Sequence, residues 1–269
     1  MSRDTLPTTL VTGVGVWAMG FPDAAGWQTG TRDPAIEAPT GNALDRRSRR
    51  RASRLTRSFS DVLTEATTQA NADLSTVPTV FGSSLGEAAT MIKLLDQMWR
   101  EKSALSPTSF AMSVHNAASG LISIAAGNRG FTTSLAADYD TVAATLFEAI
   151  GLVGTGHGPT AVTCADESAP KDLVPEAEHF DMLATALVLA PAADAQDGAL
   201  ATMRGPFVVA ADEVCVPPSD AIGATVARNP QVGLLDLIDA VQRQRYGVIR
   251  LDRGRGRGWA VELTPPPTR

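Results

Sequence analysis

Short apolar or β-branched segments alternate with stretches of helical periodicity along most of this chain. The extended segments are at residues 9–18, 76–84, 132–135, 159–167, 179–192 and 205–216. Helical periodicity covers residues 41–71, 86–102, 141–150 and 233–245; a loop and then a helix of small residues are expected at 106–128, and a β-ribbon at 246–263. This alternation predicts a layered α/β domain in which helices pack on a sheet.

The strand-to-helix junction within residues 132–150 has the plan of a catalytic turn but no catalytic side chain. Residues 132–135 form the predicted strand, and Val142, Leu146 and Ile150 fall on one helical stripe after it. Such a junction directs the free N–H groups of the first helical turn outward, where many enzymes place a nucleophile. Here residues 136–139 read AADY, which includes no serine, cysteine or threonine.

The composition is that of a globular protein. Of the 269 residues, 44% are hydrophobic and 19% are charged, and the net charge of −6 opposes binding to nucleic acid. No apolar run reaches the roughly 18 residues that span a bilayer, and the N-terminus has no signal-peptide pattern. We therefore expect a cytoplasmic protein in which Cys164 and Cys215 are separate buried thiols rather than a disulfide.

The sequence GSSLG at residues 82–86 matches the G-x-S-x-G nucleophile turn and lies between a predicted strand and a predicted helix. In one interpretation Ser84 is an acyl-transfer nucleophile, which would need a carboxylate and a histidine such as Asp166 and His179. In the other, the glycines permit a tight turn and Ser84 has no catalytic role. We favour the tight turn, because the pattern is short and no histidine-presenting loop follows Asp166.

Neither a metal site nor a dinucleotide site is indicated. The three histidines, His115, His157 and His179, share no helix at metal-ligand spacing, and the cysteines form no C-x-x-C pair. The glycines at positions 13 and 15 resemble a dinucleotide turn, but no helix opens directly after them. We interpret them as loop material at the end of the first strand and expect no cofactor.

An arginine-rich run, RRSRRRASRLTR, occupies residues 46–57. Five of its arginines fall near one side of the predicted helix, opposite the apolar stripe: Arg46, Arg47, Arg50, Arg54 and Arg57. They form a solvated helix face, a docking surface for an acidic partner, or a nucleic-acid patch. The last interpretation is the weakest, because no aromatic residue is interleaved there to stack on bases.

Several stretches together resemble the ketosynthase-like family of the thiolase fold, and in particular the short β-ketoacyl synthase N-terminal domain proteins. They read VTGVGVWAMGFPD, RRSRRRASRLTR, TVFGSSLGEAATMIKLLDQM, SPTSFAMSVHNAASGLISIAAGNRGFTTSLAA and TLFEA, and the likeness extends to about Ala190. Those short proteins are similar to the chain-length-factor partners of type II ketosynthases from aryl polyene and xanthomonadin-like pigment clusters. The resemblance implies half of a thiolase-like fold, a mixed sheet with helices on both faces.

The resemblance also implies that this chain is not an enzyme by itself. In catalytic relatives the junction reads like TACSSSLVA, and setting V-A on Val142 and Ala143 places the reactive cysteine at Ala137. An alanine cannot carry an acyl group, so the loading step is impossible there. A second half with two further catalytic histidines is not expected either, because the chain ends too early.

The family likeness implies that the chain pairs with a catalytic ketosynthase as a heterodimer. Residues matching the relatives' interface and acyl tunnel, or following the vacant position, are Phe110, Met112, His115, Asn116, Asp138 and Tyr139. Bulky Phe110 and Met112 would limit chain length by filling the tunnel end, although ordinary core packing explains them equally well. His115 is expected to be structural, and the arginine run would attract an acidic acyl carrier protein.

Two other functions remain open at this stage: a serine hydrolase or acyltransferase that uses Ser84, and a homodimeric scaffold that binds acyl carrier protein. The expected organisation is a ketosynthase-like N-terminal domain over residues 1–195, continued by a helix and β-ribbon over 196–262. Residues 263–269 are expected to form a disordered tail.

Overall fold

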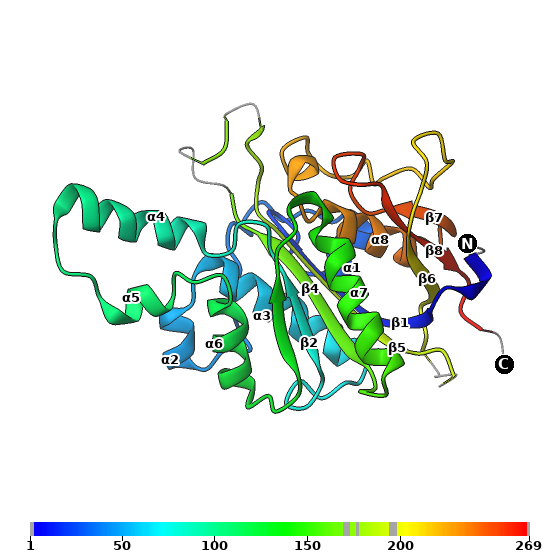
Figure 1. The fold of residues 1–269 in the computed structure, drawn as a ribbon, viewed down its shortest axis with the longest axis horizontal. Helices are drawn as coiled ribbons and strands as arrows, with labels where there is room; N and C mark the ends of the chain where they lie inside the picture. Colours follow the sequence, from blue (N-terminus) through cyan, green and yellow to red (C-terminus); the bar gives the residue numbers. More distant parts are fainter. Residues whose placement is uncertain (1–2, 169–172, 176–177, 194–197, 268–269) are drawn as a thin grey trace.

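The structure is a computed structural model that describes residues 3–168, 173–175, 178–193 and 198–267. Its centre is an eight-stranded sheet with the order β3-β2-β4-β5-β1-β6-β8-β7 (Figure 1). The strands are β1 (Thr8–Ala18), β2 (Thr79–Gly82), β3 (Thr132–Leu135), β4 (Thr160–Asp166), β5 (Leu183–Pro191), β6 (Ala201–Val208), β7 (Gly247–Arg250) and β8 (Trp259–Thr264). Strand β2 pairs in parallel with β3 and β4, whereas the other pairs are antiparallel.

Helices cover both faces of this mixed sheet. They are α1 (Ala24–Thr29), α2 (Arg46–Arg51), α3 (Arg54–Gln69), α4 (Ala88–Asp96), α5 (Pro107–Ala111), α6 (Ala117–Ala126), α7 (Thr141–Gly154) and α8 (Val232–Gln242), with short turns η1 (Arg3–Thr5), η2 (Gln97–Glu101), η3 (Asp138–Asp140) and η5 (Val226–Arg228). Helices α3 and α6 share one core cluster, and α7 and α8 share another. The expected mixed sheet with helices on both faces is confirmed.

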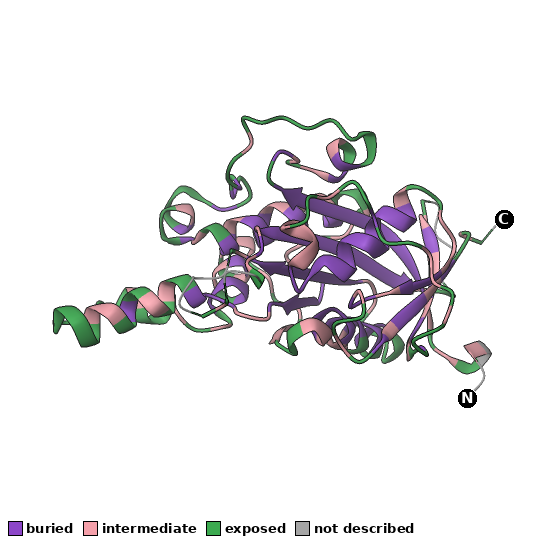
Figure 2. Ribbon diagram, turned by 90° about the horizontal axis from the view of Figure 1, so that it is seen from above, coloured by how far each residue is buried: buried purple, intermediate pink, exposed green. Residues whose placement is uncertain are grey.

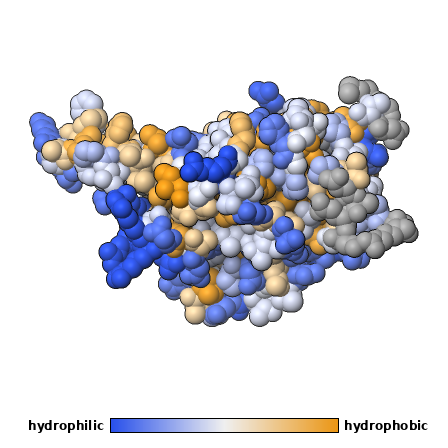
Figure 3. Space-filling view, turned by 90° about the horizontal axis from the view of Figure 1, so that it is seen from below, coloured by the Kyte–Doolittle hydropathy of each residue, from blue (hydrophilic) through white to orange (hydrophobic). Residues whose placement is uncertain are grey.

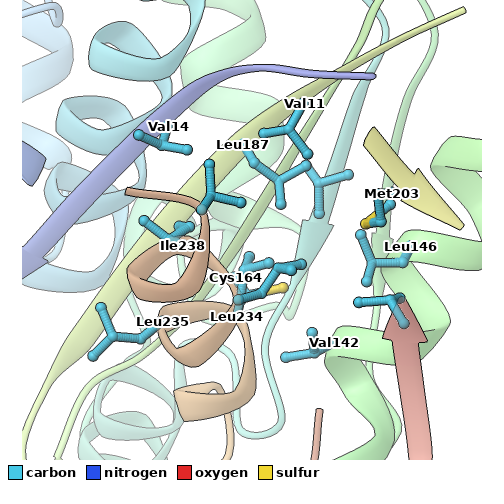
Figure 4. Close-up of a cluster of buried hydrophobic side chains, with 14 of the residues drawn as sticks. Val11, Val14, Val142, Leu146, Cys164, Leu187, Met203, Leu234, Leu235 and Ile238 are labelled. Atoms are coloured by element: carbon cyan, nitrogen blue, oxygen red, sulfur yellow. The ribbon is translucent and has the colours of Figure 1, made fainter. Parts of the chain in front are cut away.

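The two helices α7 and α8 bury the largest of the three hydrophobic clusters among the described residues. Side chains from β1, β4 and β5 meet those of α7 and α8 there, including Val142, Cys164 and Leu235 (Figure 4). The strands are buried along most of their length (Figure 2). Because α8, β6, β7 and β8 all follow residue 196, the C-terminal part of the chain is built into the same sheet and core.

The glycines at positions 13 and 15 lie inside β1 and allow α3 to pack directly on the strand. A Cβ added to Gly13 would lie 2.1 Å from the carbonyl oxygen of Ala66, and one added to Gly15 would lie 2.3 Å from that of Val62. The interpretation of these glycines as loop material was wrong, because β1 continues to Ala18. Their spacing of two puts both on the face that receives the helix.

Side chains of α3 also complete the hydrogen bonding of β1. Strand β6 pairs with β1 only from Thr8 to Val11, which leaves later N–H groups on that edge without a strand partner. The N–H of Val14 donates to Gln69 Oε1 at 2.8 Å, and that of Val16 donates to Glu65 Oε2 at 3.0 Å. The other Glu65 oxygen accepts from Ala24 N at 2.8 Å, so this carboxyl joins α3, β1 and α1.

The single helix expected over residues 41–71 is divided in two. Asp45 caps α2 by accepting from Arg47 N and Ser48 N, and Ser53 caps α3 by accepting from Thr56 N. Between them Ala52 is extended, with φ −65° and ψ 128°. Two capping side chains eight residues apart each start a helix. The sequence contains both, but the apolar periodicity of α3 favoured a single continuous helix.

Element ends differ from expectation at three further places. The strand expected at 205–216 begins earlier, at Ala201, and ends at Val208. The helix expected to Lys102 changes after Asp96 into the π-helical turn η2. Strand β8 continues to Thr264, so residues 263 and 264 belong to the sheet rather than to the expected tail, and residues 268 and 269 lie outside the described residues.

Helices α4 and α5 with turn η2, residues 88–111, form an arm that projects from the body (Figure 1). The arm exposes large apolar side chains to solvent: Met91, Leu95, Met98, Trp99 and Phe110. Trp99 is 72% exposed and Phe110 is 61% exposed. Apolar surface of this extent on a single chain is typical of an interaction site.

Replacement of Gly15 by alanine is expected to destabilise the fold by roughly 1–3 kcal/mol, because the new methyl group overlaps the backbone of Val62 and α3 must move. Urea unfolding followed by circular dichroism measures the loss. Gly151→Ala is the matched control: no atom lies within 4 Å of its added Cβ, and it lies within α7. We expect this control to be neutral or slightly stabilising; equal losses in the two variants would contradict the close-packing argument.

The stability of the protein should fall as pH rises from about 5 to 7.5. Burial raises the pKa of Glu65 from 4.5 to about 7, so in this range the folded state holds a proton that the unfolded state has released. Burial raises the pKa of Glu167 to about 7 as well, so both groups act in the same direction. The variant Glu65→Gln should show a shallower pH dependence of the unfolding free energy, and an unchanged slope would contradict this assignment.

Candidate functional site

The junction after β3 turns most sharply at Asp138. Its φ of +50° is in the left-handed region, whereas Ala137 has φ −152° and ψ 37°. A nucleophile turn holds its reactive residue at the strained position. Asp138 is therefore the strained residue of this turn, one position after Ala137, where the family resemblance places the reactive cysteine; that placement stays a prediction. Neither residue carries a thiol or a hydroxyl, and both are exposed.

Hydroxyl groups hold this turn in place. The Ala137 N–H donates to Thr141 Oγ1 at 2.9 Å, and that hydroxyl donates to the Asp138 carbonyl at 2.7 Å. Ser84 Oγ donates to the same carbonyl at 2.9 Å. The loop after β2 and the first residue of α7 therefore fix the backbone of Asp138 in its strained conformation.

A buried carboxylate lies beneath the turn. Asp166, at the end of β4, accepts at Oδ1 from Ser83 Oγ (2.6 Å) and Leu85 N (3.0 Å). Its Oδ2 accepts from Ser84 N (2.9 Å) and Gln231 Nε2 (2.7 Å). Burial raises the pKa of Asp166, and these four hydrogen bonds act in the opposite direction by stabilising the ionised form. The arrangement fits a structural anchor, because all four donors are already supplied by the chain.

Two buried amides from the C-terminal part complete this network, and sequence reasoning did not identify them. Gln231 also donates to Ser84 Oγ at 2.9 Å. Asn229 Nδ2 donates to the carbonyls of Asp166 (3.1 Å) and Asp181 (2.9 Å), and its Oδ1 accepts from Gln231 N (2.9 Å). Both amide side chains are fully buried. The signal for them was a pair of amides around a proline, directly before an apolar helix.

The geometry around Ser84 fits the tight-turn interpretation. Its hydroxyl donates to a main-chain carbonyl and accepts from Gln231, so no base holds its proton. The left-handed glycine of the GSSLG segment is Gly86, with φ +56°, and Ser84 itself is not left-handed. Asp166 contacts the backbone of the segment rather than an imidazole. The nucleophile–base pair of a serine hydrolase is not formed among the described residues.

The three histidines stay apart from one another. His115 Nε2 donates to the Ser83 carbonyl at 2.8 Å and packs against Gly86, whose added Cβ would lie 2.8 Å from the imidazole. His157 contacts Thr155 Oγ1 at 3.1 Å, and His179 is half-buried. The described residues include no cluster of metal-ligating side chains.

Tyr139 and Asp140 are held by the loop between β7 and β8. The Tyr139 hydroxyl accepts from Arg255 Nη1 at 2.9 Å, and the guanidinium lies 5.0 Å from the ring centre. Asp140 Oδ1 accepts from Arg257 N at 2.9 Å. Tyr139 thus makes contacts within its own chain, while the side chain of Asp138 is exposed. Burial raises the pKa of Tyr139, which keeps its hydroxyl neutral.

Four of the six expected interface residues lie on or beside the arm, and the other two, Asp138 and Tyr139, lie at the junction. Phe110 is exposed on α5, Met112 is half-buried directly after it, and Asn116 is exposed before α6. Phe110 is therefore not a core residue of this chain. Of these four, His115 is connected to the junction, through the Ser83 carbonyl. The role of these residues in an interface or tunnel stays a prediction.

The five arginines assigned to partner docking divide into two groups. Arg54 donates to the Glu37 carbonyl at 2.7 Å, and Arg57 donates to the Arg49 carbonyl at 3.0 Å, so both support the local backbone. The side chains of Arg46, Arg47 and Arg50, all on α2, form no hydrogen bond or ion pair with another described residue. These three remain available for an acidic partner.

Both cysteines are free thiols, as expected. Cys164 is buried in the core beside Thr145, and its burial raises the pKa of the thiol to about 12. Cys215 is only half-buried, which corrects the expectation that both would be buried. Within the ranges that the structure describes, no helix is both long and apolar enough to cross a membrane.

Loss of the Asp166 charge is expected to disconnect the network. In Asp166→Asn the new amide group faces donors, so we expect a loss of at least about 2 kcal/mol in unfolding free energy. Ser84→Ala, the control, removes one half-exposed hydroxyl and should cost about 1 kcal/mol or less. Chemical denaturation measures both. A serine variant as damaging as the aspartate variant would show that Asp166 is not the anchor.

Solved structures with a ketosynthase fold resemble this chain. One is a chain from the complex of a ketosynthase (ApeO) with its chain length factor (ApeC) from Xenorhabdus doucetiae: identity 20%, TM-score 0.64, covering 95% of this chain and 99% of that chain. Another is a type II polyketide ketosynthase bound to its acyl carrier protein (AntDE:AntF), with 13% identity, TM-score 0.58, and 76% and 69% covered. A β-ketoacyl synthase from Burkholderia phymatum STM815 has 12% identity, TM-score 0.59, and 89% and 78% covered.

Comparison of sequences gives the family. No curated protein sequence matches this chain significantly. The family profile described as β-ketoacyl synthase, N-terminal domain, matches residues 25–244, which include the junction, the Asp166 network and the arm. The chain therefore belongs to the family of β-ketoacyl synthase N-terminal domains.

Proposed function

We propose that this protein is a non-catalytic, chain-length-factor-like subunit that pairs with a catalytic β-ketoacyl-ACP synthase. In that complex it shapes the acyl tunnel of its partner, in a cytoplasmic pathway that makes polyenes of the aryl polyene type or similar fatty-acid-like chains. The observation that carries the proposal is the strained turn at Asp138, which keeps the architecture of a nucleophile site without a nucleophile.

The chemistry of the junction supports a non-catalytic role. Condensation begins with transfer of an acyl group to a nucleophile, and neither Ala137 nor Asp138 offers a thiol at the turn. The thiol of Cys164 lies in the core with its pKa raised by burial, so it is protonated at neutral pH. Ser84 is engaged with a carbonyl and an amide.

Exposed apolar surface supports a partner chain. Strand β3 is one of the two outer strands of the described sheet, the other being β7, and it pairs with β2 on one side. Near it in the sequence, Ile124 on α6 is 79% exposed and Phe131 is 44% exposed, and the arm adds Trp99 and Phe110. An unpaired outer strand with apolar neighbours is suited to association with another chain.

The structures that resemble this chain include complexes with partner chains. The Xenorhabdus doucetiae complex joins a ketosynthase to its chain length factor, and the AntDE:AntF complex joins a ketosynthase to its acyl carrier protein. By analogy, we assign a catalytic ketosynthase as the partner of this chain. Phe110 and Met112 are the side chains proposed to reach the partner's tunnel, because they are bulky, apolar and not buried in this chain's own core.

An acyl carrier protein is proposed as a second, transient partner. Arg46, Arg47 and Arg50 form a basic surface on α2 in a chain whose net charge is −6. Long-range attraction between such a patch and an acidic carrier protein speeds association more than it strengthens binding.

Co-expression with a ketosynthase encoded beside this protein should yield a stable one-to-one complex, because the exposed apolar surface is covered only in the pair. Ile124→Asp should abolish co-purification while leaving the fold intact, since this side chain is 79% exposed. Val214→Asp, at a side chain that is 90% exposed in the loop after β6, should leave the complex unchanged.

Two results would contradict the proposal. In one, the wild-type chain does not co-purify with the ketosynthase and forms a homodimer, which would favour a scaffold that binds acyl carrier protein. In the other, the purified chain alone becomes acylated and elongates a malonyl-derived substrate. Size-exclusion chromatography with light scattering and intact-mass spectrometry distinguish these outcomes.

A further inference from the structure

We propose that the hollow between α2 and the arm is a binding site for an aliphatic carboxylate, an anion that carries an unbranched apolar tail. This hollow, the arm cavity, has a volume of about 520 Å³. Its lining includes the cations Arg50, Arg51 and Lys93 and the apolar residues Ala52, Ala89, Leu94 and Met112. The inference concerns this chain alone and does not depend on the proposed function.

The cations of the arm cavity are available to a ligand. Arg50 and Arg51 come from the last turn of α2, and Lys93 comes from the last turn of α4 on the opposite wall. Within the described part of the chain, none of the three side chains forms a hydrogen bond or an ion pair. Figure 3 shows the strongly hydrophilic atoms of α2 close beside the apolar atoms of the arm. A carboxylate that reached these groups would gain charge-assisted hydrogen bonds.

Besides the cations, a site for such a ligand needs apolar surface to contact its tail, and four lining residues of the arm cavity are apolar. Leu94 is 7% exposed and Met112 is half-buried, so both present apolar surface to the cavity rather than to open solvent. Small-molecule sites have volumes of roughly 300–1,000 Å³ and combine apolar walls with a few polar groups that fix orientation. The arm cavity combines the three cations with four apolar residues. Its other lining residues are the polar Ser53, Thr90, Gln97, Thr108 and Ser109 and the acidic Glu167.

One acidic side chain also lines the arm cavity and makes the expected binding sensitive to pH. Glu167 follows β4, and its carboxyl is near Glu87 from the start of α4, Asp166 from β4 and Arg54 from α3. Burial is the main cause that raises the pKa of Glu167 to about 7. Above neutral pH this carboxylate repels an anionic ligand, and below it the neutral acid does not.

Isothermal titration calorimetry of the full-length protein with decanoate, acetate and decanol tests the site. Decanoate should bind at one site. Acetate has the carboxylate without the tail, and decanol has the tail without the charge, so we expect each of these two to bind at least tenfold more weakly than decanoate. We expect decanoate affinity to be about fivefold higher at pH 6 than at pH 8.5. In Glu167→Gln this difference should disappear.

Matched variants separate a defined site from general attraction. The pair Arg51→Glu and Lys93→Glu should weaken decanoate binding at least tenfold. The pair Arg46→Glu and Arg47→Glu changes the net charge of the protein by the same amount, at α2 residues outside the cavity, and should have little effect. Ala89→Trp, at an exposed lining position, should block the cavity without altering the core.

The proposal is overturned if decanoate does not bind the wild-type protein, or if decanol binds as tightly as decanoate. Equal losses in the two arginine-containing pairs would also overturn it, because they would show unspecific attraction to α2. Circular dichroism spectra of all variants establish that each is folded before binding is compared.

Discussion

One buried carboxylate joins the parts of this fold that are far apart in sequence. Asp166 accepts hydrogen bonds from the loop after β2 and from Gln231 at the start of α8, while Asn229 binds its main-chain carbonyl. A carboxyl group this deeply buried is tolerated only when hydrogen-bonding partners surround it. The chain therefore has to bring residues 83–85 and 229–231 together around β4, and the position of the junction follows from that.

The junction inherits its rigidity from this anchor. The Ser84 N–H donates to Asp166, and the Ser84 hydroxyl donates to the carbonyl of Asp138. The Thr141 hydroxyl donates to the same carbonyl. In an enzyme, strain at such a turn would serve to present a reactive atom. Here the same support holds an exposed carboxylate, Asp138, beside a tyrosine that is bound by Arg255. The turn presents this carboxylate at the surface of the chain.

The fold class could be predicted because each element has a long enough apolar pattern. Residues 54–69 show helical spacing, and residues 160–166 form a continuous apolar strand typical of a buried position. Glycine positions were misleading, because a glycine that ends a strand and one that admits a helix look alike in sequence. Gly15 shows its role only when the carbonyl of Val62 is placed 2.3 Å from its missing side chain.

The site was less predictable than the fold. The sequence shows that residues 136–139 include no serine, cysteine or threonine, but it does not show that Asp138 has a left-handed backbone, because that conformation depends on the bonds its carbonyl accepts from Ser84 and Thr141. The amides of Asn229 and Gln231 around a proline could be noticed in the sequence, but their bonds to Asp166 could not be predicted, since nothing local links them to a residue more than sixty positions earlier. Long-range hydrogen bonds of this kind have no periodic signature, and only the assembled sheet brings them together.

The order of the strands also determines where the ends of the chain lie. Strand β6 pairs with β1 on one side and with β8 on the other. Thr8 at the start of β1 lies opposite Arg204, and Thr264 at the end of β8 lies opposite Thr202, so both flank β6. Both ends are on the side of the molecule away from the arm (Figure 1). A second polypeptide could thus be tethered to either end, as a fused domain or an affinity handle, without crossing the apolar helices at the far side.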